Sequence, residues 1–229
     1  MEWLDSRTGQ STHQLRHLLG GFISNVSRID LQNLVPQPKI GLCRTPLWNE
    51  ASAESRSAIE DAAKRLASAG AAFRDVALPE SFEALNEART VINLVERARA
   101  MTHEWNTNRA LISPGLTRQI EAGLATPYAR YIASLQRMKA CRDQVPDMFG
   151  DADILLTPCV AGEAPKGLES TGDTRFQEFW TALHVPTITL PTHKGPNGLP
   201  IGIQLVARLY DDETLLAAAR WAFEHLGRA

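Results

Sequence analysis

The chain has 229 residues, of which 44% are hydrophobic and 22% charged, the composition of a globular protein with a sizeable buried core. Its formal net charge of −2 gives no reason to expect nucleic acid or an anionic membrane as a partner, and no uncharged stretch approaches the length of a membrane span. The polar N-terminus lacks a signal-peptide core, and the three cysteines have no paired spacing, so we expect a cytoplasmic protein with reduced thiols.

The first 35 residues are an N-terminal segment whose fold the pattern does not define, ahead of a regular region over residues 36–229. His13 and His17 are four residues apart and would share one face of a helix. The stretch HQLRH has Gln14 where a zinc protease needs its general-base glutamate. We therefore expect a solvated helix face here and no metal site.

A β-α-β unit is predicted at the start of the regular region. Its parts are a strand at Lys39–Cys43, a helix that Ser52 or Ser55 can cap and that ends before Gly70, and a strand at Ala72–Leu78. The turn after the first strand, Arg44-Thr45-Pro46, contains no glycine that would let the backbone approach a pyrophosphate. This absence excludes a dinucleotide site.

Three helices are predicted next, at Phe82–Trp105, at Gly115–Ala122, and after Thr126-Pro127, where a cap precedes a proline at the first helical position. The first has a broad apolar face, which indicates substantial burial. The third carries an aromatic and aliphatic stripe, which is more typical of core than of a ligand site.

A buried β-hairpin is predicted near the C-terminus. Two β-branched runs, Thr187–Leu190 and Ile201–Val206, flank the turn-forming residues Lys194–Gly198. Pro186 and Pro191 bracket the first run, so its ends should lie outside the hydrogen-bond ladder. Since both runs are nearly free of charge, we expect them to be buried on both faces. The chain is thus α/β, a mixed sheet with covering helices.

Three motifs in this region resemble the C-terminal half of the amidase signature family. Asp153–Pro158 resembles its "D-hydrophobic-L-L-T-P" strand, and Phe179–Pro191 resembles its "F-N-x-x-G-x-P" segment. Gly198–Val206 resembles its "G-L-P-hydrophobic-G-hydrophobic-Q" strand, and the acidic-start helix Asp211–Leu226 follows. The resemblance reaches back to about Pro38 and implies hydrolysis of a carboxamide to a carboxylate plus ammonia or an amine.

The chemistry of the family, as the resemblance implies, uses two serines, a lysine base and a Gly/Ser-rich oxyanion loop. No Gly/Ser-rich run occurs here, and none of the five lysines stands in a matching context. We therefore expect no catalytic residue in this chain and no activity of the chain alone. Cys159, Glu163 and Lys166 are the residue types of another amide-hydrolysing triad, but their closeness in one loop favours an ordinary loop cysteine.

Candidate substrate-binding residues come from the resemblance. Trp180, Thr181 and His184 fall at the family's F, N and G positions, in the segment that leads toward the substrate cleft. The alternative is that Trp180 packs in the core and His184 is structural. Glutamine-directed members have an acid near the position of Thr174, whereas here the acid is Asp173, so the resemblance does not extend to glutamine specificity.

The leading hypothesis is the C-terminal portion of an amidase-signature hydrolase, and the alternative is a non-catalytic binding or partner subunit, a truncated pseudoenzyme. A nucleotide-binding α/β protein is disfavoured because no Gly-rich phosphate loop is present. The expected partners are a small-molecule amide in the complete enzyme and either a second copy or a missing N-terminal half. We expect no cofactor, metal, nucleic acid or membrane. The apolar strands predict that the chain alone associates or melts early.

Overall fold

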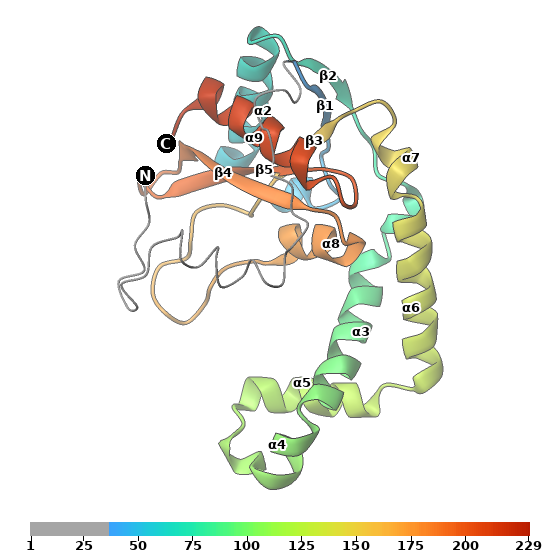
Figure 1. The fold of residues 1–229 in the computed structure, drawn as a ribbon. Helices are drawn as coiled ribbons and strands as arrows, with labels where there is room; N and C mark the ends of the chain where they lie inside the picture. Colours follow the sequence, from blue (N-terminus) through green and yellow to red (C-terminus); the bar gives the residue numbers. More distant parts are fainter. Residues whose placement is uncertain (1–36) are drawn as a thin grey trace, which may run out of the picture. The chain divides into compact units, whose positions relative to one another are not determined.

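Residues 37–229, which the computed structural model describes, contain a five-stranded mixed sheet with strand order β2–β1–β3–β5–β4 (Figure 1). The strands are β1 (Lys39–Leu42), β2 (Ala72–Asp75), β3 (Ile154–Pro158), β4 (Thr187–Lys194) and β5 (Pro200–Val206). The strand β1 is parallel to β2 and β3, whereas β5 is antiparallel to β3 and β4. The predicted α/β class and mixed sheet are confirmed. The predicted N-terminal segment, with His13 and His17, lies outside the described residues.

Helices lie on both faces of this sheet, and others extend away from it (Figure 1). They are α2 (Ala53–Ser68), α3 (Leu85–Ala100), α4 (Thr102–Thr107), α5 (Pro114–Ala125), α6 (Tyr128–Asp143), α7 (Val145–Phe149), α8 (Arg175–Leu183) and α9 (Asp212–Leu226), with short 3-10 turns at Trp48–Glu50, Glu80–Phe82 and Arg109–Leu111. None of these helices combines the length and apolar character that crossing a membrane requires.

Alternation along the central strand divides the core into two layers. Ile154 and Leu156 of β3 pack with residues of α2 and α9, whereas Leu155 packs with residues of α3, α6, α7 and α8. Successive side chains of a strand point to opposite faces, so one strand serves both layers. All five residues of β3 are buried.

The helix α2 follows its sequence signals closely. The Ser52 hydroxyl accepts a hydrogen bond from the N–H of Ser55 at 3.1 Å, which makes Ser52 the cap. The helix ends at Ser68, and Ala69 is its C-terminal cap. The next residue, Gly70, has a φ of +107°, a conformation that glycine adopts without strain. Both predicted boundaries are confirmed.

The predicted helix Phe82–Trp105 is divided between α3 and α4. The Thr102 hydroxyl donates to the carbonyl of Arg99 at 2.6 Å, which satisfies one of the free carbonyls at the end of α3. The predicted cap of α6 is wrong for a similar reason. The hydroxyl of Thr126 donates to the carbonyl of Ala122 at 2.8 Å, so Thr126 closes α5 and does not cap α6.

The hairpin prediction is correct for β5 and wrong for β4. Strand β5 is largely buried, but β4 is the outermost strand and exposes Thr187 and Thr189. Pro191 lies inside β4, beside a register shift between Pro191 and His193. An outer strand tolerates proline because its N–H is not needed for a second ladder.

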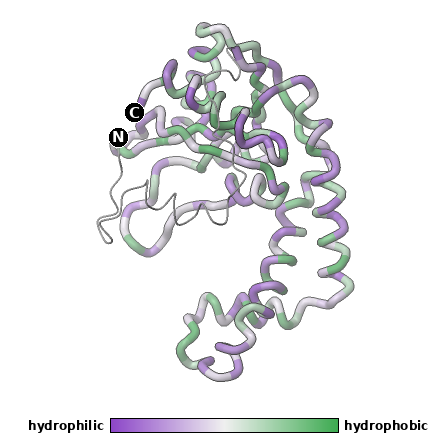
Figure 2. The backbone as a smooth tube through the Cα atoms, viewed as in Figure 1, coloured by the Kyte–Doolittle hydropathy of each residue, from purple (hydrophilic) through white to green (hydrophobic). Residues whose placement is uncertain are grey.

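The helices α3, α4, α5 and α6 form an arm that extends from the sheet (Figure 1). Within this arm, α3 packs against both α5 and α6. Hydrophobic and hydrophilic residues alternate along α3 and α6 (Figure 2), as expected for helices that bury one stripe each. The helices α5 and α3 approach closely at Gly123, where an added Cβ would lie 2.1 Å from the carbonyl oxygen of Leu94 and 2.8 Å from the Cβ of Ala98.

We predict that Gly123→Ala destabilises the protein by about 1–3 kcal/mol, because the added methyl group would force the two backbones apart. Denaturant unfolding followed by circular dichroism measures this change. Gly115→Ala is the matched control in the same helix, since nothing lies within 4 Å of its added Cβ. The control should be neutral or slightly stabilising, and equal destabilisation by the two variants would contradict a close α5–α3 crossing.

Candidate functional site

The helix α8 carries the residues that the sequence proposes for substrate binding. At its start, an Asp173 carboxylate oxygen accepts the backbone N–H of Arg175 at 2.9 Å, and the carboxylate also pairs with the Arg175 guanidinium at 2.7 Å. At its end, His184 adopts a left-handed conformation with φ +61° and donates its N–H to the carbonyl of Thr181. The family glycine that the resemblance places at this position would adopt such a conformation freely.

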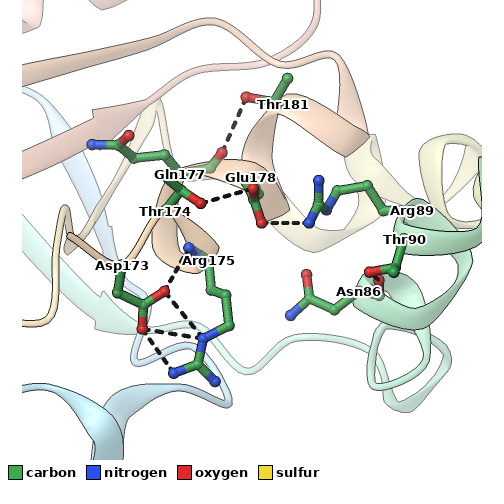
Figure 3. Close-up of polar contacts among 9 residues, drawn as sticks. All are labelled: Asn86, Arg89, Thr90, Asp173, Thr174, Arg175, Gln177, Glu178 and Thr181. Atoms are coloured by element: carbon green, nitrogen blue, oxygen red, sulfur yellow. Dashed lines mark hydrogen bonds and ion pairs between the residues drawn. The ribbon is translucent and has the colours of Figure 1, made fainter. Parts of the chain in front are cut away.

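The outward face of α8 is polar (Figure 3). Glu178 accepts hydrogen bonds from the Arg89 guanidinium of α3 and, at 2.8 Å, from the hydroxyl of Thr174. Both carboxylate oxygens of Glu178 are therefore engaged, and the ion pair with Arg89 ties α8 to the base of the arm.

A hollow between α3, α6 and α8, named here the helical hollow, has a volume of about 410 Å³. Thr181 and His184 line it, together with Arg142 of α6. Trp180 does not: its side chain is fully buried in the core and meets the ring of Phe179 edge-on, with centroids 5.0 Å apart. The structure therefore brings together two of the three proposed residues, and the substrate-binding role of the three stays a prediction.

A second hollow, named here the hairpin hollow, lies between the loop after β3 and the β4–β5 hairpin and has a volume of about 310 Å³. The Sγ of Cys159 lies 3.0 Å from the Thr189 hydroxyl and 3.5 Å from the Gln177 amide nitrogen. All three cysteines of the chain are free and buried.

Glu163 also lines the hairpin hollow, but its side chain is hydrogen-bonded to the turn of the β4–β5 hairpin. Its carboxylate accepts the backbone N–H of Leu199 at 2.8 Å and the side-chain amide of Asn197 at 2.6 Å. Burial raises the pKa of Glu163, but these hydrogen bonds outweigh that effect and lower it. Within residues 37–229, no hydrogen bond joins Cys159, Glu163 and Lys166, which agrees with the interpretation of Cys159 as an ordinary loop cysteine.

A row of three polar residues crosses the sheet on the face that α8 covers, and the sequence analysis did not find it. Thr157 of β3 lies opposite Gln204 of β5, which lies opposite Thr189 of β4. Thr157 and Gln204 are buried, and their Oγ1 and Oε1 atoms have no hydrogen-bond partner among the described residues. The available signal was the presence of Thr157 and Gln204, two polar residues, at core-facing positions of β3 and β5. Within residues 37–229, no group of three or more His, Cys, Asp and Glu side chains could hold a metal ion.

Among the charged groups of the helical hollow, Arg142 is the one that shifts the pKa of His184. The pKa of His184 is lowered mainly by burial and, to a smaller extent, by the positive charge of Arg142. The pKa of Arg142 is itself lowered by burial. Its Nε donates to the carbonyl of Ala182 at 2.8 Å, which fixes the guanidinium against α8.

A family model described as Amidase matches residues 26–216 of this chain. The chain belongs to the amidase family. Among curated relatives, a subunit of the mitochondrial glutamyl-tRNA(Gln) amidotransferase of Drosophila pseudoobscura pseudoobscura is 24% identical over 87% of this chain and 46% of its own length. The corresponding subunit of Carboxydothermus hydrogenoformans is 27% identical over 81% of this chain and 44% of its own length.

Solved structures of amidase family members share the fold. A crystal structure described as an amidase superposes with a TM-score of 0.74 at 26% identity, over 94% of this chain and 50% of the other. A chain from a vestigial complex, described as revealing the evolutionary origins of an s-triazine catabolic enzyme, superposes with a TM-score of 0.73 at 23% identity, over 87% of this chain and 45% of that one. The chain spans about half the length of the relatives it matches, or less.

We predict that Arg142→Gln raises the pKa of His184, because it removes a positive charge that disfavours the protonated imidazole. The pKa should move toward its ordinary value without reaching it, since burial, the larger cause, remains. An NMR titration of the His184 ring signals measures the shift. Arg137→Gln, an exposed position on the same helix, is the control and should leave the pKa unchanged. A lower pKa in Arg142→Gln would contradict the assignment of Arg142 as the source of the charge.

Proposed function

We propose that this chain is the C-terminal portion of an amidase-signature hydrolase, which converts a small carboxamide to a carboxylate plus ammonia or an amine. In this proposal the chain supplies part of the sheet and one wall of the amide cleft, and another segment supplies the serines and the lysine. The observation that carries the proposal is the extent of the structural match, which takes in 94% of this chain and half of an amidase.

The outer strand β4 has an edge that a further strand could pair with, which supports this proposal. Within residues 37–229, β4 pairs only with β5, so one side of its backbone has no ladder. Such an edge is a template for a further strand, supplied by an N-terminal half or by a second copy of the chain. Both remain proposals for the partner.

Thr181 and His184 are proposed to contact the amide substrate, since both line the helical hollow. Trp180 is proposed to contribute by packing beneath them, where it sets the position of α8. A simple amide is favoured over glutamine because both Asp173 oxygens accept hydrogen bonds from Arg175, which leaves no unengaged carboxylate there to bind an α-ammonium group.

A second candidate function is a non-catalytic partner subunit. The feature that favours it is the lack of a Gly/Ser-rich run or a matching lysine in the 229 residues. In both proposals the chain alone does not hydrolyse amides, and the two differ in whether a catalytic half restores turnover.

The test of the leading proposal compares ammonia release from benzamide and hexanamide by the purified chain with release after co-expression with the N-terminal half of an amidase relative. The chain alone should give no release above the buffer blank, since loss of a catalytic triad lowers the rate on the order of a millionfold. In the reconstituted enzyme, Thr181→Ala should raise KM severalfold with kcat nearly unchanged, and Thr107→Ala, on the exposed arm, should change neither. Turnover by the chain alone that Cys159→Ala abolishes would contradict the proposal.

Association through β4 gives a separate prediction. Light scattering coupled to size-exclusion chromatography should show dimers or larger species that increase with protein concentration. Thr187→Lys places a charge on the exposed edge and should shift the population toward monomer. Thr107→Lys is the charge-matched control on α4. A stable monomer with an ordinary, cooperative melt would show that the chain covers these strands itself.

A further inference from the structure

Arg142 is a half-buried cation with most of its hydrogen-bonding capacity unused. Its Nε is engaged by the Ala182 carbonyl, but within residues 37–229 its terminal nitrogens make no hydrogen bond or ion pair. A guanidinium carries five N–H donors, so four are left. Arg89, the other arginine that lines the helical hollow, is by contrast paired with Glu178. Burial of a cation without a counter-charge is unfavourable unless an anion joins it.

The acids around the hollow do not neutralise Arg142. Glu178 is already paired with Arg89, and its second oxygen accepts the Thr174 hydroxyl. Glu96 accepts the Tyr131 hydroxyl at 3.3 Å. The pKa of Arg142 is lowered by burial with no carboxylate raising it, whereas the pKa of Arg44 is raised by Glu60 and Asp75. Among the described residues, Arg142 therefore has no carboxylate paired with it.

Part of the lining is apolar. Ile92 of α3 and Leu135 and Met138 of α6 face the same hollow, whose volume of about 410 Å³ is in the usual range for small-molecule sites. A planar guanidinium holds a carboxylate through two parallel hydrogen bonds, a geometry that a neutral amide does not match. The guanidinium and the apolar side chains beside it therefore fit a ligand that joins a carboxylate to an apolar body.

We propose that the helical hollow binds a small organic carboxylate with an aliphatic or aromatic body, in which Arg142 holds the carboxylate and Ile92, Leu135 and Met138 contact the body. The inference concerns the same hollow that the proposed function assigns to the amide, but it does not rest on hydrolysis. Binding is a property of the chain by itself and does not require a catalytic half.

The test is an NMR titration of the full chain with hexanoate and benzoate, each compared with its neutral amide, hexanamide or benzamide. The carboxylates should bind saturably and at least tenfold more tightly than the amides. They should also raise the pKa of His184, because a bound anion favours the protonated ring. The charged groups that line the hollow with His184 are Arg89 and Glu96 of α3, Arg142 of α6 and Glu178 of α8.

Arg142→Gln should weaken carboxylate binding roughly tenfold to a hundredfold, the range for loss of hydrogen bonds to a charged group. Arg137→Gln removes the same charge from the exposed side of α6 and should bind like the parent. Thr181→Trp should block the hollow while leaving Arg142 in place, so the test survives if Arg142→Gln fails to fold. Equal affinity for carboxylates and amides, unchanged binding in Thr181→Trp, or no saturable binding of either carboxylate would overturn the proposal. None of these outcomes depends on ammonia release.

Discussion

The pairing of β3 with β1 on one side and β5 on the other is the constraint on which the rest of the structure depends. It joins a parallel β-α-β unit to an antiparallel hairpin, and the residues of β3 alternate between two core layers. Because both faces of β3 are buried, a shift of one residue in register would exchange the two layers. The helix α8, and with it the helical hollow, is positioned by the layer that contains Leu155.

Sequence patterns predicted the parts of the fold that local physics determines. Ser52 and Gly70 delimit α2 because a cap and a positive φ are local requirements. The pattern failed at Thr126 and Thr102, whose hydroxyls could either bond to carbonyls of the preceding turn or cap the next helix, and only the three-dimensional chain decides between these options. It also failed for β4, because freedom from charge does not reveal whether a strand is central or outermost.

The candidate site was predicted only in part, for a related reason. Thr181 and His184 could be found because the resemblance places them in the cleft segment, but Arg142 could not. It lies about forty residues earlier in the chain, and only the folded structure brings α6 against α8. Trp180 lies in the core, which is the alternative that the sequence analysis left open. A residue adjacent to proposed ligand contacts on a helix points about 100° away from them, toward the core.

The carboxylate of Glu163 has a mechanical role. It accepts hydrogen bonds from Asn197 and Leu199. The lack of a side chain at Gly195 leaves room for this carboxylate, since a Cβ there would lie 2.3 Å from the Cγ of Glu163. One acid thus fastens the long loop after β3 to the tip of the hairpin. Because its pKa is lowered in the folded protein, the fastening is present above the ordinary carboxylate range and is lost as the pH falls through the lowered pKa. Protonation of this one carboxylate would therefore free the loop from the hairpin. The sheet is held by backbone pairing and apolar burial, which do not depend on that proton.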